Sequence, residues 1–138
     1  MSKGIGMEEQ ANESVLKDID DMHNEYSYES IIESKVTVFQ MYFSDLVVYC
    51  KRVGTYFVND TEFFNTLFGM KKKLNKIFDK LINNKRRSID DLLKEVYDDC
   101  DKLILRLNAI DDKYLRASRQ DTLFHLLKLK TLLYMFSI

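Results

Sequence analysis

The sequence predicts an all-α protein, an antiparallel four-helix bundle in an up-down-up-down arrangement with a short additional helix at the N-terminus. Apolar residues recur at alternating intervals of three and four positions along most of the chain, which is the period of a helix with one buried face. The 138 residues include no proline and only four glycines, so few positions interrupt long helices. Short polar connections between the apolar stripes favour antiparallel neighbours.

The N-terminal segment, residues 1–11, contains two glycines and several small polar residues and is expected to be a flexible tail. Residues 12–138 are expected to form one domain, because a chain of this length can bury a core without disulfides or metals. The first helix of that domain is predicted to be short. Asn12 and Ser14 are its capping candidates, and Val15 begins its apolar stripe.

Four longer helices are predicted to follow, each with a continuous apolar stripe at heptad-like spacing. Their expected bounds, in chain order, are 30–58, 59–83, 88–114 and 118–137, with Asp121 as an alternative start for the last. Glu62 is expected to reach back to the amide of Asn59 and so cap the second of these helices. The last helix carries apolar residues on nearly all sides, so it should be central in the bundle or contact another chain.

Positive and negative charges nearly cancel, because 21 Lys and Arg face 22 Asp and Glu for a net charge of −1. Such a balance provides no overall field to steer the chain toward nucleic acid or an anionic membrane. No apolar run approaches the roughly 20 residues that span a bilayer, so no membrane-spanning helix is expected. The N-terminus also lacks an apolar signal sequence, and the expected location is therefore intracellular, either cytoplasmic or nuclear.

Residues that usually carry catalysis or metal binding are few and scattered. Cys50 and Cys100 each fall on an apolar stripe, where a reduced thiol behaves as a small apolar side chain. The two histidines, His23 and His125, do not form the ligand pairs that zinc or di-iron sites need. We therefore expect a protein that is not an enzyme, with no catalytic residue, no metal ligand and no cofactor.

A cluster of basic residues lies at the end of the second long helix and in the connection after it. Its members are Lys71, Lys72, Lys73, Lys76, Lys85, Arg86 and Arg87. Such a cluster could contact phosphates, which makes a nucleic-acid-binding module one alternative function. The favoured interpretation is a solvated face, because cations near a helix C-terminus also complement the helix dipole.

A second alternative is an enzyme centred on His125. His125, Leu126, Leu127 and Lys128 resemble the H-x-L-K core of histidine phosphotransfer domains, which are themselves four-helix bundles. This resemblance implies an exposed imidazole that accepts a phosphoryl group, although Leu129 and the lysine after it replace the small residues that those domains need there.

Arg119 and His125 also resemble the R-x(4–6)-H pattern of HEPN-type ribonucleases, another all-α class. That resemblance implies an arginine that stabilises phosphate charge and a histidine that handles the proton. The structural interpretation of a solitary histidine on an apolar helix is a packed and hydrogen-bonded side chain, and we favour it over both enzymes.

Tyr42, Tyr49 and Tyr56 recur every seven residues beside the main apolar stripe of the first long helix. They could close the edge of the core with their hydroxyls in water. Equally, such a row could be where a partner helix docks, because tyrosine is enriched at protein interfaces.

The leading hypothesis is a non-enzymatic helical protein–protein interaction module, such as a small adaptor, complex subunit or modulator. The tyrosine row, together with Leu127 and Tyr134 of the very apolar last helix, would form the partner-binding surface. We expect a protein partner in a homo-oligomer or a larger complex.

Overall fold

The part of the chain that the structure describes folds into five α-helices, which confirms the all-α prediction. Their bounds are α1 Met7–Glu25, α2 Ile31–Arg52, α3 Thr61–Ile82, α4 Asp90–Asn108 and α5 Arg116–Phe136. Two short 3-10 turns, η2 (Gly54–Phe57) and η4 (Lys113–Leu115), lie in the α2–α3 and α4–α5 connections. The computed structural model describes residues 6–25, 31–83 and 89–136, and no strand occurs within these ranges.

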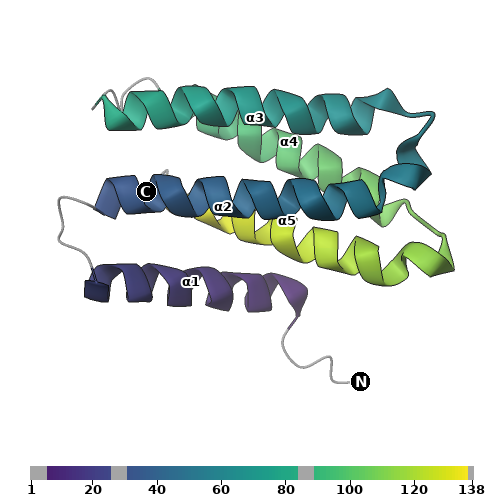
Figure 1. Cartoon of the computed structure of the whole chain (residues 1–138), viewed down its shortest axis with the longest axis horizontal. Helices are drawn as coiled ribbons and strands as arrows, with labels where there is room; N and C mark the ends of the chain where they lie inside the picture. The colour runs from purple at the N-terminus through teal and green to yellow at the C-terminus, as the bar shows by residue number, and fades with distance from the viewer. Residues whose placement is uncertain (1–5, 26–30, 84–88, 137–138) are drawn as a thin grey trace.

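The helices are arranged around α5. Figure 1 shows that consecutive helices run in opposite directions, with α1, α2 and α3 in front and α4 and α5 behind them. α5 contacts α1, α2 and α4, while α3 packs against α2 and α4. Leu126, Leu129 and Leu132 of α5 are completely buried. The sequence predicted either a central position or contact with another chain for this helix, and its central position is confirmed.

α1 is longer than the short helix predicted, and its first turn falls within the expected tail. It begins at Met7 and contains 19 residues, as many as α4. Glu8 and Glu9 lie in the first turn, where the helix dipole favours negative charge. Ala11 and Val15, four residues apart on one face, are completely buried. The apolar face of α1 therefore extends into the segment that composition alone assigned to a tail.

The predicted long helix over 30–58 is wrong at its C-terminal end. α2 ends at Arg52, and the chain then turns through η2, which Gly54 begins. A Cβ atom on Gly54 would lie only 3.2 Å from the ring of Phe64, so glycine permits this close approach. Phe57 stays buried after the turn. The apolar spacing thus continues beyond the last residue of α2, so it does not show where the helix ends.

The cap of α3 also differs from the predicted one. Asp60, not Asn59, is the N-cap, and its carboxylate accepts a hydrogen bond of 3.1 Å from the amide of Glu62. The carboxylates of Asp60 and Glu62 both pair with the guanidinium of Arg106 on α4. Glu62 therefore joins two helices instead of reaching back along its own.

The boundary between the last two helices lies earlier than predicted. α4 ends at Asn108, although Ile110 beyond it remains buried, and Tyr114 is 84% exposed instead of belonging to the helix. The carboxylate of Asp112 accepts the amide of Tyr114 at 2.8 Å and caps η4. α5 then begins at Arg116, before both predicted caps, Ser118 and Asp121.

Truncating the centre of α5 tests its importance for stability. Leu129→Ala should lower the free energy of unfolding by about 2–5 kcal/mol, because it leaves a cavity where α5 meets its neighbours. Leu105→Ala is the matched control, since Leu105 is 72% exposed and should lose about 0.5 kcal/mol or less. Urea unfolding followed by circular dichroism measures both, and equal losses would contradict a central role for α5.

Candidate functional site

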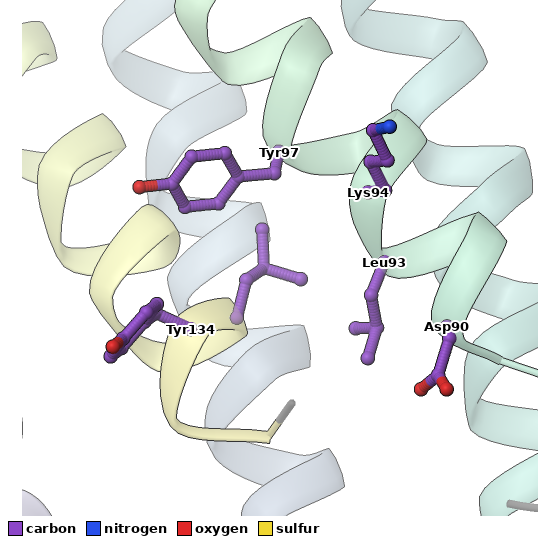
Figure 2. A pocket seen from close by; sticks show the side chains of 6 residues that line it. Asp90, Leu93, Lys94, Tyr97 and Tyr134 are labelled. Atoms are coloured by element: carbon purple, nitrogen blue, oxygen red, sulfur yellow. The ribbon is translucent and has the colours of Figure 1, made fainter. Parts of the chain in front are cut away.

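A groove opens between α4 and α5 near the C-terminal end of α5, with a volume of about 410 Å³. It is lined by Asp90, Leu93, Lys94 and Tyr97 of α4 and by Leu133 and Tyr134 of α5. Figure 2 shows the ring of Tyr97 extending from α4 toward α5, where Tyr134 lies. Aromatic and aliphatic side chains thus form most of its surface.

A second groove of about 410 Å³ lies between α1 and α5. It is lined by Glu8, Asn12 and Leu16 of α1, by Tyr97 of α4, and by Leu127, Lys130, Thr131, Tyr134 and Met135 of α5. Both grooves include Tyr97 and Tyr134. We refer to the two together as the Tyr134 groove, which follows the C-terminal half of α5 between α1 and α4.

The Tyr134 groove combines exposed apolar side chains with a lysine that is held by an ion pair. Leu16 is 51% exposed and Tyr134 is 59% exposed. The ammonium of Lys130 donates to Asp101 at 2.7 Å and lies 4.6 Å from the centre of the Tyr97 ring. Partial burial of Lys130 lowers its pKa, but the hydrogen bond and charge of Asp101 outweigh this and raise the pKa overall. Lys130 therefore remains charged and holds α5 against α4.

The wall on the α1 side is fixed by a hydrogen bond between side chains far apart in the sequence. The hydroxyl of Thr131 on α5 donates to the side-chain oxygen of Asn12 on α1. Asn12 was predicted only as a helix cap, but it lies in the second turn of α1 and joins two helices instead. This contact keeps Leu16 beside the exposed face of α5.

Of the five predicted partner-binding residues, Leu127 and Tyr134 line the Tyr134 groove, whereas the tyrosine row does not. Tyr42 is buried, and its hydroxyl donates to Asp18 of α1. The other two tyrosines also contact more distant parts of the chain. Tyr49 stacks on His125 of α5, with ring centres 4.2 Å apart, and the hydroxyl of Tyr56 donates to the carbonyl of Ala109 at 3.2 Å. These contacts favour the interpretation in which the row closes the core edge.

Tyr97 and Leu16 line the groove but were not predicted as site residues from the sequence. Each stands next to a completely buried residue, Val96 and Val15 respectively. An apolar residue beside the main stripe of an otherwise charged helix is the signal that could have identified them. Their meeting at one groove depends on how α1 and α4 are placed on α5.

His125 packs against aromatic rings and is half-buried. Besides stacking on Tyr49, its ring meets Phe124 edge to face, with ring centres 5.8 Å apart. Burial lowers the pKa of His125 and the nearby charge of Lys128 lowers it further, while Asp45 and Asp121 act in the opposite direction. The neutral imidazole is therefore favoured.

The other residues in the two resemblances also have local contacts. The guanidinium of Arg119 donates to the carbonyl of Ile110 at 2.9 Å and so closes the α4–α5 connection. The ammonium of Lys128 lies over the rings of Tyr42 and Phe124, at 4.4 and 5.8 Å from their centres. Arg119 and His125 thus each contact a different part of the fold.

The basic cluster is only partly within the described residues. Lys71, Lys72 and Lys76 are exposed on α3. Lys73 instead donates to the carboxylate of buried Asp99 on α4 at 2.8 Å. The other three members, Lys85, Arg86 and Arg87, lie outside the described residues. Lys73 therefore has a structural role, which reduces the part of the cluster that α3 presents to solvent.

Cys50 and Cys100 are both buried and free of disulfide bonds. Burial raises the pKa of Cys50 to about 12 and also raises the pKa of Cys100, so neither thiol ionises readily near neutral pH. Within the described ranges, no group of three or more His, Cys, Asp or Glu side chains is placed to hold a metal ion. The helices of that same part of the chain include none long and apolar enough to cross a membrane.

Comparisons with known proteins do not connect this chain to a relative. No protein family, curated protein or solved structure matches it. Its function is therefore inferred from the geometry of its own side chains, and above all from the Tyr134 groove.

Removing the charge of Lys73 should destabilise the fold more than removing the charge of a neighbouring lysine. Among the described residues, Lys73→Met leaves the buried carboxylate of Asp99 with the ion pair to Lys102, whose ammonium is 4.0 Å away. The free energy of unfolding should fall by about 1–3 kcal/mol. Lys72→Met is the control and should change it by less than about 0.5 kcal/mol, because Lys72 is exposed. Chemical denaturation of both variants measures the difference, and similar values would contradict the structural role of Lys73.

The pKa of His125 should lie below the ordinary value of about 6.5, as measured by an NMR titration of its ring protons. The variant His23→Gln removes the ring-proton signals of the other histidine, so the signals that remain belong to His125. Lys128→Met should raise the pKa of His125 because it removes a nearby positive charge, whereas Lys94→Met should leave it unchanged. An unchanged pKa in Lys128→Met would show that this charge does not act on the imidazole.

The same shift predicts how stability depends on pH. Because the folded pKa is lower than the unfolded one, the unfolded chain binds more protons around and below pH 6.5. The contribution of His125 to the free energy of unfolding is therefore present above about pH 6.5 and falls as the pH drops from there toward the folded pKa. Replacing His125 with Gln should flatten this part of the stability profile.

Proposed function

We propose that this protein is a non-enzymatic helical interaction module that binds a protein partner through the Tyr134 groove. It would act as a small adaptor, complex subunit or modulator within an oligomer or larger complex. In this proposal α2 to α5 form the antiparallel bundle predicted from the sequence, and α1 adds the outer wall of the groove. The observation that carries the proposal is that two apolar grooves of about 410 Å³ each meet at Tyr97 and Tyr134.

The distribution of buried and exposed apolar side chains supports this choice of surface. Ala11, Val15 and Ile19 bury one face of α1, which itself packs mainly on α5, so much of the apolar excess of α5 is covered within the chain. Leu16 and Tyr134 remain about half exposed on either side of the resulting groove. A partner would cover the apolar surface that these two side chains leave exposed. Tyrosine is also among the residues that are enriched at protein–protein interfaces.

The contacts around the groove support binding to a preformed surface. Lys130 is held by Asp101, and Thr131 is held by Asn12, so both walls are joined to α5 by side-chain bonds. A surface that is already ordered loses little conformational entropy on binding. The two buried, unpaired thiols are consistent with action in a reducing, intracellular compartment.

A photo-cross-linking residue placed in the groove tests the proposal. With p-benzoylphenylalanine at Tyr134, irradiation in cells of the native host should produce a covalent adduct with a protein, either another chain or a second copy. The same replacement at Tyr114 is the matched control, because Tyr114 is 84% exposed but lies in η4, before the N-terminal end of α5, whereas the groove follows the C-terminal half of that helix. Mass spectrometry identifies the adducts. No adduct at position 134, or the same adducts at both positions, would overturn the proposal.

A further inference from the structure

We infer that the partner segment that occupies the Tyr134 groove is a cationic amphipathic helix. This inference rests on the proposed function and adds the chemical class of the partner. It follows from three properties of the groove: the charge of the helices on either side, the length of the exposed strip of α5, and the position left open beside α5.

The two helices that flank the groove are the acidic helices of the protein. α1 contains seven acidic residues and one lysine, and α4 contains six acidic residues and three basic ones. α3, by contrast, contains five lysines and two acidic residues. The net charge of the whole chain is only −1. The excess of negative charge on the two helices beside the groove is therefore balanced by basic residues elsewhere in the chain.

Acidic side chains lie along both rims. On α1, Glu8 lines the groove, and the exposed pair Glu9 and Glu13 forms the next row outward by the helical period. On α4, Asp90 lines the groove, and the exposed Asp98 occupies an equivalent outer row.

The basic residues at the groove do not reverse this charge. Lys94 lines the groove one turn from both Asp90 and Asp98 and offsets one of these two charges, whereas the charge of Lys130 is offset by its bond to Asp101. Glu8, Glu9 and Glu13 on the α1 side have no lysine among the lining residues of α1. The rims therefore favour cationic groups on whatever occupies the groove between them.

The dimensions of the groove suit about two to three turns of helix. Its residues on α5 extend from Leu127 to Met135, and those on α1 extend from Glu8 to Leu16. At 1.5 Å per residue each wall is therefore about 12 Å long. An amphipathic helix of this length presents apolar side chains at positions i, i+4 and i+7, which would contact Leu16, Leu127 and Tyr134.

The position beside α5 is also suited to a helix. α5 already contacts α1, α2 and α4, and α1 and α4 are not among the closely packed helix pairs. A further helix packed on α5 between them would need the interaxial distance of about 8–10 Å that is usual for packed helices. Its polar sides would then face the acidic rims.

The same charges argue against other occupants. If two copies paired groove to groove around a two-fold axis, the acidic rims of each would face those of the other, and like charges would repel. An anionic membrane surface would be repelled in the same way. A partner helix with Lys or Arg beside its apolar stripe meets both requirements, because it covers the exposed apolar side chains and complements the rims.

Three synthetic peptides with one leucine stripe test this inference against the full-length protein. Each is a helical peptide of roughly 18 residues, and the polar positions are all Lys, all Gln or all Glu. Isothermal titration calorimetry should give at least about tenfold tighter binding for the Lys peptide than for the Gln peptide, and weaker binding still for the Glu peptide. The preference for Lys should decrease as salt is raised.

Variants locate the binding site. Tyr134→Ala should weaken binding of the Lys peptide about tenfold through lost apolar contact. The double variant Glu9→Gln/Glu13→Gln should weaken the Lys peptide but leave the Gln peptide unchanged, and both of its positions are exposed, so the fold is retained. Leu105→Ala removes an exposed leucine and is the matched control.

Several results would overturn the inference. Lys and Gln peptides that bind equally, with Tyr134→Ala weakening both, would remove the charge preference but leave the proposed function intact. Binding of no peptide, self-association that Tyr134→Ala abolishes, or binding to anionic vesicles in place of the peptides would each reject a cationic helix as the occupant. The cross-link at position 134 then decides separately whether the groove is a protein-binding site at all.

Discussion

The burial of one apolar helix by three others is the constraint on which the structure depends. Leu126, Leu129 and Leu132 of α5 are completely enclosed, and each of α1, α2 and α4 contributes part of the enclosure. A helix with so many apolar sides is stable in water only when neighbours cover it. The placement of those three neighbours then determines where apolar surface remains, and that surface is the Tyr134 groove.

The spacing of apolar residues predicted which segments are helical but not where the helices end. The fold class and the central position of α5 both follow from the spacing of apolar residues and the location of polar connections. The ends of α2 and α4 do not, because Phe57 and Ile110 remain buried after their helices have stopped. A buried residue in a 3-10 turn or a connection continues the same spacing that a helix would show.

The candidate site was predictable only in part, for a different reason. Leu127 and Tyr134 stood out because α5 is unusually apolar, whereas Tyr97 and Leu16 matter only through their neighbours in space. The groove exists because α5, the last helix, packs against α1, the first. The bond between Asn12 and Thr131 joins residues 119 positions apart. A pattern within one helix carries no information about such a contact. For the tyrosine row, spacing left two interpretations open, and the contacts with Asp18, His125 and Ala109 favour one of them.

The distance between α1 and α5 along the chain has a consequence for how the protein is made. During translation α1 emerges first, while the helix that buries its apolar face is synthesised last among the five. At synthesis rates of about 5–20 residues per second, several seconds pass between the synthesis of α1 and that of α5. The α3–α4 pair, whose members are adjacent in sequence, can associate earlier, because short loops cost less entropy to close. The newborn chain therefore passes through a period in which α1 has only its smaller contact with α2, and the seven carboxylates of α1 favour solubility while its apolar face is uncovered.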